Sequence, residues 1–173
     1  VQALSLPHGV ERIEALGNDA VVIGAQGRDL HFSTIGLGTQ AAVATRYIRA
    51  DAAQGESRSH GFFYKPQTAS EGMIGLPILG ADERPGLSRP AASVLYLRNS
   101  GLTLTELGAL AARPGPAPDD GCRASCVDWY GNARPLFLQG RVFALLGYEV
   151  VEGALKDGQI REVRRISYAP TAR

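Results

Sequence analysis

Long apolar runs are missing from this sequence, and no stretch approaches the roughly 20 residues that a membrane-spanning helix needs. An excess of one charge is missing too, because 18 basic residues nearly balance 17 acidic ones and leave a formal net charge of +1. Such a balance indicates neither nucleic acid nor an anionic membrane surface as a partner. Sulfur is also scarce, with one Met and two Cys among 173 residues.

The single methionine, Met73, is internal, and the sequence begins VQALSLPHGV. A start without methionine predicts that the chain is processed from a longer precursor or cut from a longer polypeptide. Any export signal would already have been removed, so its absence here is uninformative about secretion.

Glycine and apolar residues are plentiful. Hydrophobic residues make up 45% of the chain and charged residues 20%, which indicates a folded protein rather than a disordered one. The 21 Gly and 10 Pro recur between short apolar runs. That punctuation is typical of an all-β chain with many turns.

Alternating or continuous apolar runs bounded by turn residues predict many short strands. The stretch 41–49 is rich enough in alanine to be a helix instead. In 159–169, simple alternation places Ile160, Glu162, Arg164 and Ile166 on one face of an exposed outer strand. The predicted strands span 10–16, 19–27, 29–37, 41–49, 59–66, 73–80, 93–101, 102–112, 133–140, 141–148, 149–158 and 159–169.

These strands fall into about three sets of about four, over residues 10–49, 54–112 and 122–169. Two Pro-rich loops, 81–92 and 113–127, interrupt the pattern. Without those loops the sets recur with a period of roughly 40–50 residues, which is typical of the four-stranded blades of a β-propeller. A β-sandwich is the alternative, because it also uses many short strands.

Both cysteines, Cys122 and Cys126, lie in the segment DDGCRASC. They could close a small disulfide loop, remain as free buried thiols, or form half of a metal site. A closed metal site needs a second ligand pair, and the three histidines are scattered along the sequence. A disulfide would require an oxidising compartment.

The segment SHGFFYKP (59–66) combines polar residues with three consecutive aromatics. We expect an innermost blade strand, with both faces covered by adjacent blades and Gly61 allowing close backbone approach. Three roles are open for Arg58, Ser59 and His60. They could form a structural corner, contribute with Tyr64 to binding at the channel mouth, or act in catalysis.

In the catalytic alternative, His60 would be a general base oriented by Glu56 or Asp51. Ser59 and His60 would point to opposite faces of a strand, so Ser59 is not predicted to be a nucleophile activated by His60. The sequence contains no motif typical of serine hydrolases, zinc proteases, P-loop proteins or dinucleotide-binding proteins.

Two further groups surround the cysteines. Trp129 and Tyr130 could contact a sugar or peptide at a rim, or pack in the core beside the cysteine loop. Asp119, Asp120 and Asp128 could bind calcium through their oxygens, or form a solvated loop. No other cofactor is indicated.

Several segments resemble a family of secreted bacterial proteins that carry a C-terminal β-propeller domain distantly related to WD40 repeats. The motifs are SHGFFY (59–64), GMIGLPI (72–78) and RPLFLQGRVF (134–143). The resemblance covers most of residues 10–168 and is strongest at 54–79 and 122–152. It brings no catalytic residues with it.

The resemblance implies a C-terminal segment of about three blades from a larger ring, in a secreted, periplasmic or cell-envelope protein. Its partners would then be the upstream blades of the same precursor. The expected function is a non-enzymatic platform that binds a protein or glycan through the two Pro-rich loops. The alternatives are an enzyme whose channel-mouth site is completed by upstream blades, and a structural assembly subunit.

Overall fold

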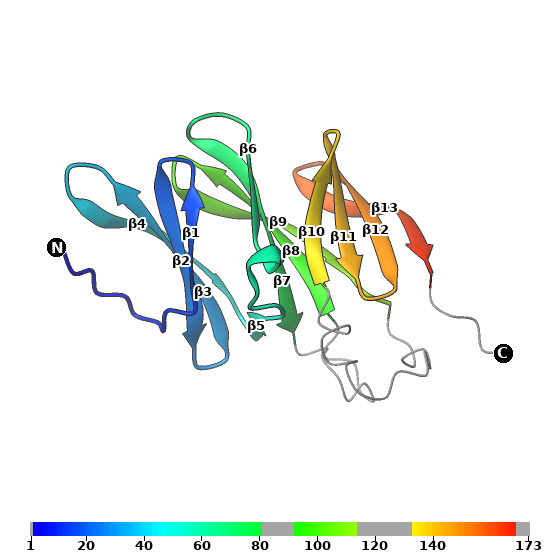
Figure 1. Cartoon of the computed structure of the whole chain (residues 1–173), viewed down its shortest axis with the longest axis horizontal. Coiled ribbons are helices and arrows are strands. Elements are labelled where there is room, and N and C mark those ends of the chain that lie inside the picture. The colour runs from blue at the N-terminus through cyan, green and yellow to red at the C-terminus, as the bar shows by residue number, and fades with distance from the viewer. Residues whose placement is uncertain (1, 81–91, 114–132, 169–173) are drawn as a thin grey trace.

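The computed structural model describes residues 2–80, 92–113 and 133–168, where the regular structure is β-strand apart from one short helical turn. The strands form three antiparallel sheets that lie side by side, with the chain ends at opposite sides (Figure 1). The all-β prediction is confirmed. No helix in these ranges is long and apolar enough to cross a lipid bilayer.

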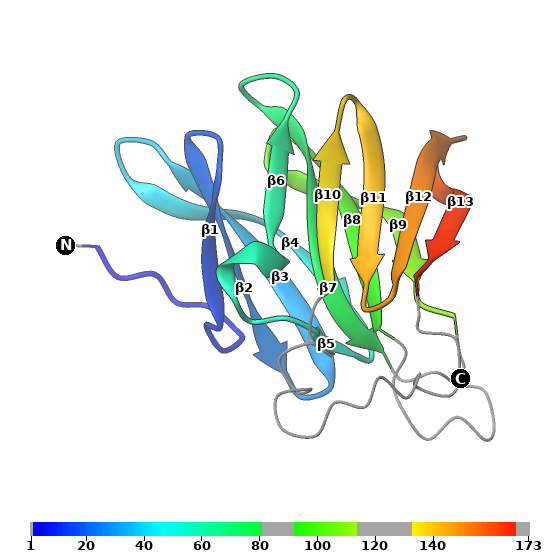
Figure 2. The ribbon, with the colours of Figure 1, turned by 45° about the vertical axis from the view of Figure 1, so that its right-hand side comes forward.

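Each sheet is built from consecutive strands, as a second view also shows (Figure 2). The first sheet contains β1 (Arg12–Leu16), β2 (Asp19–Gln26), β3 (Asp29–Leu37) and β4 (Ala41–Arg49). The middle sheet contains β5 (Ala52–Gln54), β6 (Phe63–Pro66), β7 (Glu71–Gly80), β8 (Ala92–Ser100) and β9 (Thr103–Ala111). The third sheet contains β10 (Ala133–Leu138), β11 (Arg141–Leu146), β12 (Glu149–Lys156) and β13 (Gln159–Ser167). The segment 41–49 is a strand and not a helix.

Two-residue turns join many of these strands, and their backbone geometry follows from the sequence. Gln139 and Gly140 have φ of 48° and 78°, and Asp157 and Gly158 have φ of 51° and 77°. Two successive left-handed residues define the hairpin turn whose twist matches that of the flanking strands. Gly and Asp tolerate this conformation well, so the local sequence fixes these hairpins.

The middle sheet is buried on both faces. Alternate residues of β7 and β8 enter two separate apolar clusters, one shared with the first sheet and one shared with the third. Because side chains alternate across a strand, a strand covered on both faces must be apolar at consecutive positions. The side chains directed at the first sheet are Ile74, Leu76, Ile78, Leu95 and Leu97, and those directed at the third are Met73, Val94 and Tyr96.

The middle and third sheets approach each other most closely at Gly75. A Cβ atom added there would lie 2.4 Å from Cβ of Pro135 on β10. Nearby, the Tyr96 hydroxyl donates a hydrogen bond of 2.7 Å to the backbone carbonyl of Phe143 on β11. Burial raises the pKa of Tyr96, so this hydroxyl stays a donor.

The 59–66 prediction is corrected in two respects. Ser59–Gly61 form a single turn of 3-10 helix, labelled η1, and only Phe63–Pro66 pair with β7. Phe63 is also 49% exposed, so one face of this strand is not covered as expected. The reason is that the first strand of the middle sheet is split into β5 and β6 by an insertion.

The predicted faces of 159–169 are also wrong. The pairing of β12 with β13 shifts between Glu152 and Gly153, so Val163 has no partner in the register. One extra residue moves each following side chain to the other face. Arg164 and Ile166 therefore share a face with Arg161 and not with Ile160.

We expect Gly75→Ala to lower the free energy of unfolding by about 1 to 3 kcal/mol, because the added methyl group forces Pro135 and β10 away from the middle sheet. The free energy of unfolding is measured by urea denaturation, with far-UV circular dichroism as the signal. The matched control is Gly38→Ala, where an added Cβ has no atom within 4 Å. Equal stability of the two variants would contradict the close contact.

Candidate functional site

The insertion that splits the first strand of the middle sheet contains the predicted site. Pairing with β7 continues from β5 to Gly55, whose amide donates to the Pro77 carbonyl at 2.9 Å. It resumes at Phe63, which pairs with Gly75. Residues 56–62 therefore loop out opposite Leu76 and fold into their own structure, which includes η1.

Glu56 organises this loop from a buried position, with its side chain only 4% exposed. Its Oε1 accepts hydrogen bonds from the Arg58 amide at 2.9 Å and from Arg58 Nε at 3.0 Å. Its Oε2 lies 3.5 Å from Nε2 of His60. Gly61 packs directly on Glu56, since an added Cβ would lie 2.8 Å from the Glu56 backbone oxygen.

A second arginine ties the loop to the first sheet. Arg12 of β1 is 8% exposed and donates through Nη2 to the carbonyls of Glu56 and Arg58 at 3.1 and 2.9 Å. Its Nε donates to Gln54 Oε1 at 2.9 Å, and its Nη1 pairs with Glu14 at 2.8 Å. The loop is thus fastened across the gap between two sheets by one buried guanidinium.

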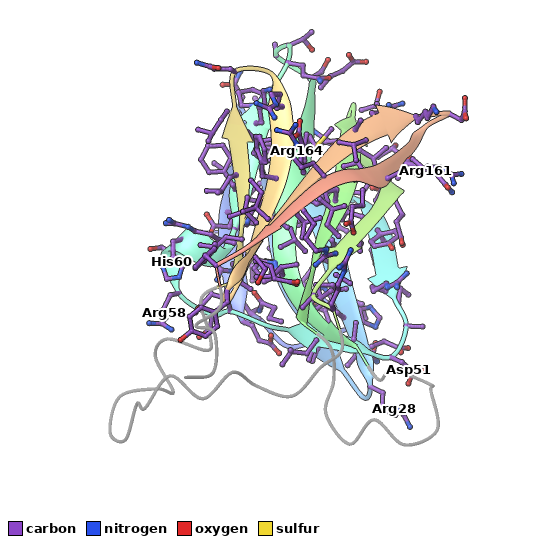
Figure 3. The ribbon with its side chains drawn as sticks, turned by 90° about the vertical axis from the view of Figure 1, so that its right-hand side faces the viewer. Arg28, Asp51, Arg58, His60, Arg161 and Arg164 are labelled. Atoms are coloured by element: carbon purple, nitrogen blue, oxygen red, sulfur yellow. The ribbon has the colours of Figure 1, made fainter. Side chains whose placement is uncertain are left out.

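The predicted binding residues are only partly brought together. Arg58 and His60 share the Glu56 carboxylate and lie at one edge of the molecule (Figure 3). Tyr64 belongs to a different environment, where its hydroxyl accepts a 3.2 Å hydrogen bond from Asn99 and its ring covers Gly72. Asp51 pairs with Arg28 at 2.7 Å and not with His60.

The remaining sequence predictions fall outside the described residues. These are the disulfide of Cys122 and Cys126, the rim contact of Trp129 and Tyr130, and the calcium ligands Asp119, Asp120 and Asp128. Nearly all of the two Pro-rich loops is outside as well. Within residues 2–80, 92–113 and 133–168, no group of three or more His, Cys, Asp or Glu side chains could hold a metal ion.

In this loop a buried carboxylate is held by hydrogen bonds and by nearby positive charge. Burial alone would raise the pKa of Glu56, but hydrogen bonds from the Arg58 backbone and side chain, with charge from Arg58 and His60, outweigh it and lower that pKa. The ionised form of the carboxylate is therefore favoured, with Oε1 accepting both hydrogen bonds from Arg58 and the buried Oε2 accepting none from the described residues. No Ser or Thr hydroxyl in the described residues hydrogen-bonds to His60, so the loop lacks the pairing that activates a nucleophile.

Sequence analysis missed a second polar cluster, on the outer face of the first sheet. His8 Nε2 lies 2.8 Å from Oγ of Ser33 on β3, and His8 Nδ1 lies 2.7 Å from the Gly9 carbonyl. The ring of His31 lies 5.4 Å from that of His8, between ring centroids. His8, His31 and Ser33 are all buried, and Ser33 is 0% exposed.

This cluster fastens the N-terminal segment onto the first sheet. The Gly9 amide donates to the Ala25 carbonyl at 3.1 Å, and the Gly9 oxygen would lie 1.8 Å from a Cβ added at Gly24. Farther along, Gln2 exchanges two hydrogen bonds with the backbone of Ala41. A Ser–His contact with no exposed Ser oxygen has no route to a substrate, so the contact is structural. The alternation that puts His31 and Ser33 on one face was the only local signal for it.

We compared the chain with known proteins in three ways. No protein-family model, no curated protein and no solved structure matches it. The resemblance to secreted bacterial propeller proteins thus stays a prediction, and the role of each polar cluster has to be argued from its geometry.

We expect Glu56→Gln to lower the free energy of unfolding at pH 7 by about 1 to 3 kcal/mol, since buried donors lose an ionised acceptor. The pKa of Glu56 is lowered in the fold, so its contribution is present above the ordinary value of 4.5 and is lost as pH falls through the folded value. Stability should therefore fall less steeply below pH 4.5 in the variant.

Chemical unfolding between pH 3 and pH 7 measures this difference. The matched control is Glu71→Gln, which changes an exposed carboxylate at the start of β7. If Glu56→Gln and Glu71→Gln gave the same pH profile, Glu56 would not be the carboxylate that fastens the loop.

We expect His8→Ala to leave the Ser33 hydroxyl buried without its partner, at a cost of about 1 to 3 kcal/mol. The N-terminal segment should then detach more often and be cleaved faster by a protease. Limited proteolysis with mass spectrometry measures the cleavage rate. Leu4→Ala, in the same segment but 38% exposed, should leave that rate unchanged.

Proposed function

We propose that this chain supplies three blades of a β-propeller and works as a protein-binding unit rather than as a catalyst. Support comes from the repetition of one arrangement, a four-stranded antiparallel sheet stacked face to face on the next. Propeller blades are four-stranded sheets of this kind. The function is argued from the surfaces that this stack leaves uncovered, because a fold by itself does not define function.

Each contact between sheets combines an apolar centre with a polar rim on the outermost strands. Between the first and middle sheets, Arg49 of β4 donates to Glu106 of β9 at 3.0 and 3.1 Å, and the Tyr47 hydroxyl also bonds to Glu106. Between the middle and third sheets, Arg165 of β13 donates to the Ala111 carbonyl at 2.9 Å. The two contacts between sheets therefore have the same arrangement, an apolar centre with a polar rim.

The main support for the proposal is the outer face of the third sheet. Register places Leu136 beside Phe143, and Leu145 beside Val150 and Ile166, all on the side away from the middle sheet. On the same side Leu138 and Ile166 are 57% and 56% exposed. The corresponding face of the first sheet is buried against the middle sheet, and the corresponding face of the middle sheet is buried against the third. Arginines also lie on this side, among them Arg141, Arg161 and Arg164. Exposed apolar residues grouped on one sheet face mark an interaction surface.

The polar clusters support binding over catalysis. Oε1 of Glu56 accepts hydrogen bonds from Arg58, Oε2 lies 3.5 Å from His60, and the Ser33 hydroxyl is bonded to His8. Both clusters hold a connecting segment against a sheet, as the structural-corner hypothesis for His60 expects. The partner we propose for the outer face of the third sheet is a further blade. Its origin in an upstream part of the same precursor, and an exported location, remain predictions.

We expect the isolated chain to associate through this uncovered face, because apolar area without a neighbour favours self-association. Light scattering over a concentration series should give a mass that rises above 18.3 kDa. The double variant Leu138→Lys, Ile166→Lys should stay monomeric. Phe63→Lys, which changes a 49% exposed residue on the middle sheet, should behave like the unchanged chain. A monomer at every concentration would contradict the proposal.

A further inference from the structure

The last strand of the third sheet, β13, has one side that no other strand of the described residues pairs with. Its strand order is β10-β11-β12-β13, so β13 pairs with β12 alone. Nothing in the described residues forms a backbone ladder with the other side of Gln159–Ile166. The amides and carbonyls of β13 that point away from β12, unpaired within the described residues, are a template for one more strand.

Two arginines on this strand make no hydrogen bond or close ion pair with a carboxylate in the described residues, although the charge of Arg164, directly across from Glu152, helps to lower the pKa of Glu152. Arg161 and Arg164 are exposed and lie on the outer face of the sheet, and Figure 3 marks both along β13. The neighbouring carboxylate of Glu152 is already held by Arg141 through two hydrogen bonds of 2.7 and 2.6 Å. Positive charge therefore exceeds negative charge along this edge.

The other two charged residues of the strand are already satisfied on its opposite face. Arg165 bonds to Glu162 and Glu149 at 2.6 Å each, and Arg113 of the middle sheet adds a 4.0 Å ion pair to Glu162. This difference between the two faces results from the extra residue at Val163. Without that bulge, Arg164 would face the middle sheet.

Exposed apolar side chains lie beside these arginines, Val163 between them in sequence and Ile166 two residues beyond Arg164. Val163 is 59% exposed and Ile166 is 56% exposed. An edge strand that only prevents aggregation is expected to carry charge without exposed apolar residues. Of the other two outermost strands, β9 exposes only Thr and Ala residues, and β4 combines one exposed arginine, Arg46, with Ile48.

We propose that β13 binds an extended acidic segment of a partner protein, which adds to the third sheet as a fifth strand. Backbone hydrogen bonds to the free side of β13 would hold the segment in register. Carboxylates on its outer face would lie directly across from Arg161 and Arg164, where cross-strand charge pairs form. The proposal names the partner chemistry for the protein-binding function above. It needs neither the propeller nor the apolar face of the third sheet.

The test uses the full chain and a synthetic ten-residue peptide of alternating Glu and Val, with fluorescence anisotropy as the readout. Alternation is the pattern of a β-strand and puts every Glu on one face. The control peptide replaces each Glu with Gln. We expect saturable binding of the Glu peptide, weakened by added salt, and clearly weaker binding of the Gln peptide.

Substitutions on β13 and on β4 show where the peptide binds. Arg161→Gln and Arg164→Gln should each weaken peptide binding by roughly two- to five-fold, the range that cross-strand charge pairs give. Arg46→Gln, which removes an exposed arginine from the β4 edge, should have no effect. Hydrogen exchange should show new protection of β13 amides when the Glu peptide is bound.

Three outcomes would overturn the proposal: no binding of the Glu peptide, binding unaffected by both β13 variants, or binding without protection of β13 amides. The last would indicate docking on the sheet face by charge alone. Equal binding of single-stranded nucleic acid and of the Glu peptide would likewise point to general attraction of polyanions. Fluorescence anisotropy of the unchanged chain reports peptide binding whether or not the chain self-associates, so failure of the self-association predicted above and failure of the peptide to bind are separate results.

Discussion

Both faces of the central strands β7 and β8 of the middle sheet are buried, and the arrangement of the other two sheets follows from this. Ile74, Leu76 and Leu97 enter one apolar cluster, while Val94 and Tyr96 enter the other. Each fully buried side chain of this size contributes about 1.5 to 3 kcal/mol relative to an exposed one. A sheet with this composition is stable only when both neighbours are in place, so the three sheets depend on one another for folding.

Close stacking of sheets requires both shape and polar complementarity. Gly75 leaves room for Pro135, and the Tyr96 hydroxyl meets a carbonyl of the facing sheet. At the outer rim, the Arg49–Glu106 pair and the Arg165 bonds satisfy polar groups that would otherwise be buried without partners. The polar rim therefore fixes how the apolar faces align.

The two polar clusters hold segments that lie outside the strands. The loop around Glu56 and the segment around His8 both leave the sheet pattern, and each is held by hydrogen bonds of a buried side chain, Arg12 for the loop and His8 for the segment. Their residues have the types found in catalytic sites, namely Ser, His, Glu and Arg. In both clusters most of the polar contacts are made within the protein, to the backbone of the segment or to each other, although the Arg58 and His60 side chains are partly exposed.

The sequence by itself determined the strands, because alternation, apolar runs and Gly-containing turns act over a few residues. The strands of the first and third sheets, and the hairpins at Gln139–Gly140 and Asp157–Gly158, needed no tertiary information. The sequence also indicated that the strands group into three sets of four. What it missed were an insertion and a bulge, which change pairing without changing composition.

Only the tertiary structure decided which residues meet. Ser33 and His8 are 25 residues apart, and Arg12 reaches carbonyls 44 and 46 residues away. Register across β12 and β13 likewise decided that Arg161 and Arg164 share a face. The physical reason is that a polar group selects its partner by distance and desolvation in the folded state, and these depend on how whole sheets stack. Local propensity carries no information about that stacking.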